Sequence, residues 1–443
     1  MSETQNIIEN FSRLNRKQKI QVLTNLLKES PEDMQWLEQL WVQPINNNSD
    51  SESIGENVVS HFLLPYSIAP NFIINDNLYF IPMVTEESSV VAAASSAAKF
   101  WLHKGGFRST VIATTKVGQI HFTWSGNYQH LRSFLPNLKE KLMTSVNYHI
   151  RNMVGRGGGV KEIELLDFTD RLHDYYQIKV LFETADAMGA NLINSCLEEM
   201  AKALRYFMHE NFEGNEGNCN IIMSILSNYT PDCLVECSVQ CKIEQFKAIA
   251  GDLTPVEFAN KFKLAIDIAN IDIYRATTHN KGIFNGIDAV AIATGNDYRA
   301  IEAGGHSYAS NDGRYKSLTH IELKNDIFTY TLRVPISLGT VGGLTSIHPL
   351  ARLSLKILKQ PTASELMQIA AAVGLANNFS AIRALITSGI QKGHMKLHLN
   401  NILSFIKANE SEKEEAKHFF RERTVSYAAV QDFINNVRNQ SKV

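Results

Sequence analysis

The sequence predicts an α+β fold with more than one domain, and two observations support this. Between about Ser109 and Ser227, strand-like and helical segments alternate. Strands are predicted for the segments VIATTKVGQIHFTW, KEIELLDF and YYQIKVLFET. Helices are predicted for Asn137–Met153 and Asp186–Met208. This order indicates a small ferredoxin-like domain inserted in a larger one. The nearest match to a G-x-G-x-x-G fingerprint, Gly155–Val160, ends in valine, so a Rossmann fold is not indicated.

The larger part is expected to be mainly helical, with an N-terminal helical arm capped at Ser12 and continued by a second helix from Ser30. Gln43–Asn57 has the composition of a linker. The other predicted elements are a strand at Asn77–Val84, a helix at Ser88–Trp101, a helix from about Pro255, a hairpin within IELKNDIFTYTLRVPI, and helices at Thr362–Leu375 and Ala381–Thr387.

The composition is that of a globular protein. The 443 residues are 44% hydrophobic and 20% charged, and the net charge of −2 gives no reason to expect nucleic acid or an anionic membrane as the main partner. No apolar run reaches 18 residues and the first thirty residues have no hydrophobic signal core, so we expect a cytoplasmic protein. Five cysteines argue against a disulfide framework, and Cys233, Cys237 and Cys241 are expected on one face of a strand.

A lysine and an aspartate stand in two segments rich in glycine and asparagine. Lys281 lies in TTHNKGIFNG and Asp297 in GND. Glycines let a backbone approach a ligand closely, and asparagines adopt turn conformations. These segments therefore predict a clamp for an oxyanion on a ligand with several polar groups.

A histidine pair leaves a metal site open as an alternative. His394 and His398 are four residues apart on a predicted helix, the spacing with which zinc enzymes place two imidazoles on one face. Met395 follows His394, however, so the glutamate of an H-E-x-x-H motif is missing. The simpler explanation is two histidines on a polar helix face. No G-x-x-x-x-G-K-[ST] phosphate loop occurs either.

Several motifs resemble one enzyme family in the same order along the chain. They are ENVVSHFLLPYSIAPNF, TEESSVVAAASSAAKF, ETADAMGAN, YRATTHNKGIFNGIDAVAIATGNDYRAIEAGGHSYA, LGTVGG, VGLANN and QKGHMKLH. Together they resemble 3-hydroxy-3-methylglutaryl-coenzyme A (HMG-CoA) reductase in its soluble bacterial class II form, from about residue 10 to the end.

The resemblance implies a domain organisation. Residues 1–108 and 228–388 would form a large domain around a central helix that binds the acyl-CoA. Residues 109–227 would form the ferredoxin-like domain that binds NAD(P), and 389–443 a mobile helical flap. The family pattern also implies a homodimer with active sites at the subunit interface, with larger assemblies left open.

The resemblance also assigns catalytic roles to Glu87, Lys281, Asp297 and His394. Reduction of a thioester to an alcohol takes two hydride transfers, through a mevaldyl-CoA hemithioacetal and mevaldehyde, so negative charge develops twice on the carbonyl oxygen. Protonated Lys281 can stabilise that charge, and Asp297, if hydrogen-bonded to Lys281, would keep it cationic. His394 suits protonation of the departing CoA thiolate, and Glu87 would protonate the carbonyl oxygen.

Each of these residues also has a simpler structural explanation. A glutamate ahead of a helix often interacts only with the helix dipole, an aspartate in a turn often has a local role, and most lysines are solvated. The binding residues that the resemblance implies are Ser89, Arg275, Asn285 and His398 for the substrate, and Asp186, Met188, Gly189, Asn191, Asn228 and Arg151 for the cofactor. No metal is implied.

The prediction of NADPH or NADH as the cofactor depends on the residues before the glycine triplet Gly157–Gly159. The NADH-specific branch of the family carries an acid seven positions before that triplet, whereas counting back from Gly157 reaches Ile150. The basic neighbours His149, Arg151 and Arg156 would favour a 2′-phosphate. We therefore predict NADPH, with NADH tolerated, and synthesis of mevalonate rather than its NAD-dependent degradation. Two other functions stay open: a zinc hydrolase that uses His394 and His398, and a non-catalytic acyl-CoA-binding protein.

Overall fold

The structure is a computed structural model that describes residues 13–27, 56–387, 389, 399–400, 402–421, 423 and 425–440. The chain divides into a unit up to Pro65 and a unit from Tyr66 onwards. In the first unit, α1 (Arg16–Leu27) confirms the predicted arm, and Arg16 Nε donates to Val59 O at 3.2 Å. Ser12, the second predicted helix from Ser30, and the linker up to residue 55 lie outside the described residues.

The second unit begins with an antiparallel ribbon of β1 (Tyr66–Ile74) and β2 (Asn77–Val84), on which α3 (Ser88–Trp101) packs. The bounds of β2 and α3 are those predicted. In α3, Ala94, Ala97 and Ala98 are buried. Small side chains on this face let neighbouring elements approach closely.

An antiparallel sheet in the order β3-β8-β10-β9 lies beside these elements. Its strands are β3 (Arg108–Val111), β8 (Leu234–Lys242), β10 (Ile327–Pro335) and β9 (Thr319–Lys324). The predicted hairpin is confirmed as β9–β10, since Asn325 and Asp326 both have the positive φ of a two-residue hairpin turn. The cysteines are free and buried, as expected, with Cys237 and Cys241 on β8.

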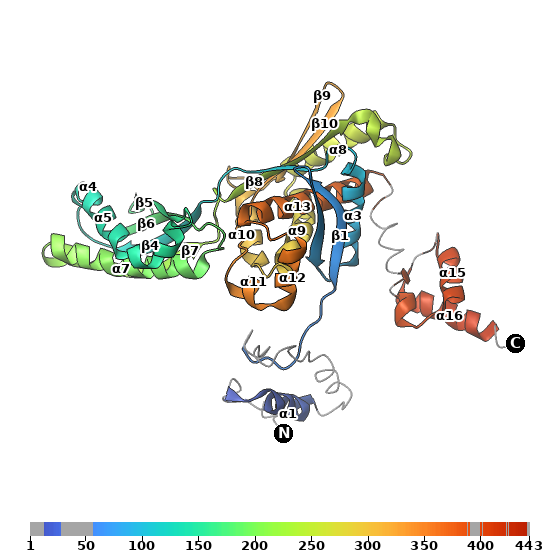
Figure 1. Ribbon diagram of the computed structural model, residues 1–443, viewed down its shortest axis with the longest axis horizontal. Helices are drawn as coiled ribbons and strands as arrows, with labels where there is room; N and C mark the ends of the chain where they lie inside the picture. Colours follow the sequence, from blue (N-terminus) through green and yellow to red (C-terminus); the bar gives the residue numbers. More distant parts are fainter. Residues whose placement is uncertain are drawn as a thin grey trace. The chain divides into compact units, whose positions relative to one another are not determined.

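Helices pack with the strands around the core of the second unit (Figure 1), and α13 has the most buried residues among these helices. The others are η4 (Ile243–Ala248), α8 (Pro255–Ile271), α9 (Ile273–Ala293), α10 (Tyr298–Tyr308), α11 (Gly343–Ile347) and α12 (Pro349–Ile357). α13 (Ala363–Ile386) is long and apolar enough to cross a membrane, but 72% of its apolar window is buried, as expected of a core helix.

Two expectations for these helices are wrong. The sequence predicts a break between Leu375 and Ala381, but α13 is continuous. Asn378 stays helical because its amide donates to His279 O at 2.8 Å and its carbonyl accepts from Tyr330. The second expectation concerns TTHNKGIFNG, which is not a ligand loop but lies within α9.

The glycines of α9 serve helix packing. A Cβ on Gly286 would lie 2.7 Å from Val373 O on α13, so only glycine permits this approach. Asn280, likewise, is buried, donates to Lys316 O at 2.9 Å and accepts from Leu318 N at 3.0 Å. Tertiary contacts thus outweigh the weak helix propensity of glycine and asparagine here.

Residues between β3 and β8 form a second antiparallel sheet in the order β5-β6-β4-β7. The elements in chain order are β4 (Lys116–Thr123), α4 (Tyr128–Ser133), α5 (Leu135–Ser145), α6 (Asn147–Val154), β5 (Gly159–Asp167), β6 (Tyr175–Glu183), α7 (Ala190–Asn211), η3 (Gly214–Gly217) and β7 (Asn220–Ser227). This is the predicted ferredoxin-like arrangement, with α5 and α7 packed together (Figure 1). The single helix predicted over Asn137–Met153 is divided into α5 and α6 at Val146.

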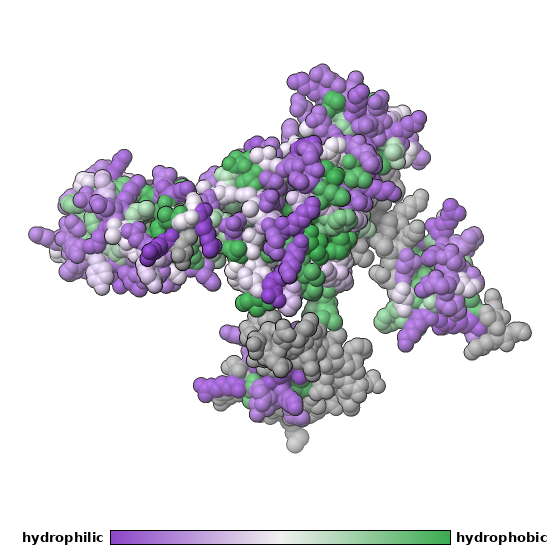
Figure 2. Space-filling view, viewed as in Figure 1, coloured by the Kyte–Doolittle hydropathy of each residue, from purple (hydrophilic) through white to green (hydrophobic). Residues whose placement is uncertain are grey.

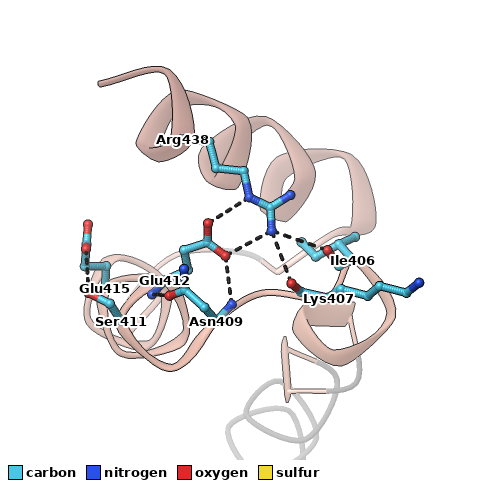
Figure 3. A network of polar contacts seen from close by, with 7 residues as sticks. All are labelled: Ile406, Lys407, Asn409, Ser411, Glu412, Glu415 and Arg438. Atoms are coloured by element: carbon cyan, nitrogen blue, oxygen red, sulfur yellow. Dashed lines mark hydrogen bonds and ion pairs between the residues drawn. The ribbon is translucent and has the colours of Figure 1, made fainter. Parts of the chain in front are cut away.

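The C-terminal residues form a small helical cluster with its own apolar core around Leu403, Ala416 and Val430. Its helices α15 (Glu410–Phe419) and α16 (Tyr427–Gln440) are joined by Glu412 and Arg438 (Figure 3). Arg438 donates to both carboxylate oxygens of Glu412, at 2.7 and 3.0 Å, while Glu412 also completes the capping box of α15 with Asn409.

Candidate active site

Two of the predicted catalytic residues are in direct contact. Lys281 Nζ lies 3.1 Å from Glu87 Oε2, and Ser89 Oγ donates to Glu87 Oε1 at 2.6 Å. Glu87 therefore accepts from a predicted catalytic residue through one oxygen and from a predicted substrate-binding residue through the other. The structure brings together a cation, a carboxylate and a hydroxyl.

Local structure explains the position of Glu87. It is the N-cap of α3 with extended backbone, but its side chain does not cap the helix. Its amide donates to Thr85 Oγ1 at 3.2 Å. Thr85 thus takes part in the turn that directs the carboxylate towards Lys281, a role the sequence did not signal.

The angular positions of residues around α9 decide which predicted residues lie on the same helix face as Lys281. Asn285 follows one turn later on that face and is half-buried. Arg275 lies six residues earlier, about 120° around the helix at 3.6 residues per turn. It is half-buried, and desolvation lowers the pKa of its guanidinium. The helix by itself therefore aligns Asn285, but not Arg275, with Lys281.

Asp297 differs from the expectation that it would hold Lys281. It is the N-cap of α10, where its Oδ1 accepts from the amides of Arg299 at 3.1 Å and Ala300 at 3.2 Å. The same oxygen lies 3.3 Å from Arg299 Nε. In this structure Lys281 pairs with Glu87 and Asp297 pairs with Arg299.

A half-buried acid near Lys281 was missed in the sequence. Asp288 lies two turns after Lys281 on α9, and its Oδ1 is buried without a hydrogen-bond partner among the described residues. Burial, together with the neighbouring Glu302, raises the pKa of Asp288 to about 8, and the charge of Lys281 opposes this. The spacing of seven residues on one helix face was the available signal.

The predicted cofactor residues lie around the loop between β6 and α7. Met188 and Asn228 line one pocket together with Lys116, Ser227, Ala300 and Ser337. Gly189 caps α7 with φ 91°, and a Cβ there would lie 2.5 Å from Thr184 Cγ2. No side chain caps α7 at Gly189, and Asn191 is exposed in its first turn.

Asp186 has a structural contact that the sequence did not suggest. Its Oδ1 accepts from Ala363 N at 2.8 Å, at the start of α13, and its backbone O accepts from Thr340 N at 2.8 Å. Asp186 therefore ties the loop to the central helix, which is a different task from contacting a ligand.

The residues used to predict the cofactor lie on α6 and just after it. Ile150 is buried in the core of the ferredoxin-like sheet, whereas Arg151 and Arg156 are exposed. A buried isoleucine presents no group to a ribose, and the two exposed guanidiniums offer donors to a phosphate.

His394 and His398 lie outside the described residues. Within the ranges that the structure does describe, no group of three or more histidine, cysteine, aspartate or glutamate side chains is arranged to hold a metal ion.

Comparisons with known proteins agree on one family. The model of the family hydroxymethylglutaryl-coenzyme A reductase matches residues 15–399. The chain is 40% identical to 3-hydroxy-3-methylglutaryl-coenzyme A reductase of Archaeoglobus fulgidus over 348 residues, which are 78% of this chain and 76% of that protein. It is 32% identical over 398 residues to a probable reductase of the same name from Borreliella burgdorferi, covering 89% and 88% of the two chains.

Solved structures match as well. The class II reductase of Streptococcus pneumoniae bound to NADPH, in open conformations, superposes with a TM-score of 0.70 at 36% identity, over 86% of this chain and 100% of that one. These matches and the absence of a Rossmann sheet in the described fold define an oxidoreductase of non-Rossmann architecture. The chain belongs to the hydroxymethylglutaryl-coenzyme A reductase family.

Proposed function

We propose that this reductase converts (S)-HMG-CoA into (R)-mevalonate and free CoA at a site formed by Glu87, Lys281, Asp297 and His394. The observation that carries the proposal is the 3.1 Å contact between Lys281 Nζ and Glu87 Oε2. It joins a fixed positive charge to a group that can move a proton, and each hydride addition to a carbonyl requires both.

In this mechanism Lys281 stabilises the oxyanion that develops on the thioester carbonyl and later on the aldehyde carbonyl. Glu87 delivers a proton to that oxygen, and its hydrogen bond from Ser89 orients the carboxyl group. His394 protonates the CoA thiolate when the hemithioacetal collapses. Two hydrides and two protons are consumed for each thioester reduced to an alcohol.

Water has to be excluded for Lys281 to act strongly, because electrostatic stabilisation grows as the local dielectric falls. The Lys281 side chain is 61% exposed in this structure. We assign its covering to the C-terminal residues 389–443, a mobile flap that would bring His394 and His398 to the substrate. Arg275 and Asn285 are proposed to bind the acyl-CoA with Ser89.

The proposed cofactor is NADPH, which supplies the hydride when bound. The residues present fit it: the uncapped amides of α7 after Gly189 suit a pyrophosphate, with Asp186 and Asn191 beside them. Met188 and Asn228 line the adjacent pocket, and Arg151 is exposed for a 2′-phosphate. Ala300, three residues after Asp297, lines that same pocket, so Asp297 would stand between the substrate and cofactor sites.

The domain assignment follows from these sites. Residues 1–108 and 228–388 would bind the acyl-CoA, and 109–227 the cofactor. We further propose a cytoplasmic homodimer that works in the direction of mevalonate synthesis. Exposed apolar side chains in each unit support a dimer: Phe62 of the first unit is 90% exposed, and Ile68, Leu78 and Phe80 of the second unit are exposed on the β1–β2 ribbon. Figure 2 shows hydrophobic residues at the surface of the second unit.

The test is to mix the protein with HMG-CoA and NADPH and follow the absorbance of the reduced nicotinamide, with Lys281→Ala in parallel. We expect two equivalents of NADPH oxidised per CoA released, and a loss of at least about 10²-fold in kcat for Lys281→Ala. An active Lys281→Ala protein would refute the mechanism. A protein that binds HMG-CoA without consuming NADPH would instead be a binding protein.

The same assay distinguishes the remaining alternatives. Equal concentrations of NADPH and NADH should give faster initial rates with NADPH, and a preference of about tenfold for NADH would contradict the role of the basic residues near Gly157. A zinc hydrolase would lose activity to chelators, which should leave the reductase unaffected.

A further inference from the structure

The loop from Thr184 to Gly189 connects β6 to α7 and carries three of the proposed cofactor residues. Its backbone conformation is unusual: Ala185 has φ 47° and Gly189 has φ 91°. The left-handed region is unfavourable for alanine, so other contacts have to hold this loop in place.

On one side, the loop is held by residues near the central helix. Thr340 N donates to Asp186 O, and Ala363 N donates to Asp186 Oδ1, both at 2.8 Å. Gly339 packs so closely that a Cβ on it would lie 2.4 Å from Met188 N. These contacts fix the middle of the loop.

On the other side of the loop, Lys116, the first residue of β4, is buried, with 5% of its surface exposed. Its Nζ donates to Ala187 O at 2.9 Å and to Thr184 Oγ1, and Thr184 Oγ1 itself donates to Ala187 O at 2.6 Å. The ammonium therefore ties the two halves of the loop together from beneath.

Burying an ammonium group costs free energy because the charge loses its hydration, so the contacts of Lys116 need an explanation. Burial lowers the pKa of Lys116, and the nearby Glu183 and Cys233 oppose this. Lys116 lines the same pocket as Met188 and Asn228. A methionine would fill this volume without the cost of desolvating a charge. The ammonium adds two hydrogen bonds to the loop, one to Thr184 Oγ1 and one to Ala187 O.

We propose that Lys116 is a positioning residue for the nicotinamide cofactor, which holds the Thr184–Gly189 loop in the conformation that presents Met188 and the start of α7. This inference rests on the proposed function. It assigns Lys116 no chemical step, because its bonds are to the loop and not to reacting atoms.

The test measures NADPH and HMG-CoA binding separately, by fluorescence titration and calorimetry, for Lys116→Met, Thr184→Val and the double variant. We expect the Kd for NADPH to rise about tenfold in each single variant while the Kd for HMG-CoA changes less than about twofold. The double variant should be no weaker than the weaker single one, because both changes break the same connection.

Lys179→Met is the matched control. Lys179 lies on the neighbouring strand β6 and pairs with Glu164 at 3.1 Å, away from the loop contacts described above. Its substitution should leave both Kd values unchanged.

An unchanged Kd for NADPH in folded Lys116→Met, or an equal loss for both ligands, would overturn the inference. If Lys116→Met does not fold, Thr184→Val decides, and an unchanged NADPH Kd in that variant overturns it. A wild-type protein that neither binds NADPH nor oxidises it with HMG-CoA would refute the proposed function itself, which is a distinct result.

Discussion

At the scale of single residues, Lys281 and Glu87 meet although 194 positions separate them in the chain. An ion pair as exposed as this one contributes only about 0–1 kcal/mol to stability, which is consistent with the catalytic role that we propose for it. Asp288 is the opposite case. Its carboxyl oxygen Oδ1 is buried and lacks a hydrogen-bond partner among the described residues, so the carboxyl group lowers the stability of the fold whenever it is ionised.

Asp288 predicts a pH dependence of stability. Its pKa is raised from 3.8 to about 8 in the folded protein, so the folded state keeps a proton that the unfolded state has lost. Its contribution is therefore fully present below pH 4 and is lost as pH rises towards 8. We expect Asp288→Asn to be more stable than wild type at pH 8, by about 1–3 kcal/mol, and to differ less at pH 5.

Urea denaturation at a series of pH values measures this difference. Asp252→Asn, on an exposed turn, is the control and should follow the wild-type curve. Parallel curves for wild type and Asp288→Asn would show that Asp288 does not titrate in this way.

At the scale of elements, the contact between α9 and α13 sets the position of Lys281. Gly286 allows the close approach, and Asn378 of α13 bonds to the backbone of α9 at His279. The two helices thus form a rigid support for the exposed side chain of Lys281, to which we assign a catalytic role.

Gly286→Ala tests this contact. The added methyl group would lie 2.7 Å from Val373 O, a backbone atom that cannot rotate away. Alanine gains about 1 kcal/mol of helix propensity, but overpacking costs about 1–3 kcal/mol, so we expect a net loss of stability of about 1 kcal/mol. In Gly282→Ala the new Cβ would lie 3.5 Å from Asn378 Nδ2, an ordinary contact.

Thermal or urea unfolding of both variants makes the comparison. Gly282→Ala should be as stable as wild type or more so. Equal stabilisation of the two variants would contradict this prediction, because it would mean that α9 and α13 move apart at Gly286 without a loss in the free energy of unfolding.

At the scale of the whole molecule, the chain inserts one sheet between two strands of another, since β3 and β8 are neighbours in one sheet and the residues between them form the second. In the proposed function, this connection lets one chain present an acyl-CoA region and a cofactor region. The proposed dimer would cover exposed apolar surface.

Phe62→Asp tests the proposed dimer. Because Phe62 is 90% exposed, the substitution should not disturb the fold of one chain, but a charge at an interface would oppose association. We expect light scattering to give the mass of two chains for wild type and a shift towards one chain for the variant, with activity falling in parallel. Leu172→Asp, another exposed apolar position, should remain dimeric. A monomeric and fully active wild type would contradict the proposal.

Local patterns predicted much of this fold. The helix at Ser88–Trp101, the strand at Asn77–Val84 and the ferredoxin-like order of the insert follow from side-chain periodicity, which is a property of neighbouring residues. The pattern around Lys281 was misleading because glycine and asparagine favour turns locally, whereas α9 is stabilised by its contacts with α13.

The sequence by itself determined the fold class, most element types and the residue types of the candidate site. Only the tertiary structure decided that Lys281 pairs with Glu87, that Asp297 caps α10 beside Arg299, and that Lys116 is buried against the Thr184–Gly189 loop. The physical reason is that pairing and burial depend on how distant elements pack, and that packing leaves no periodic signal in a single chain.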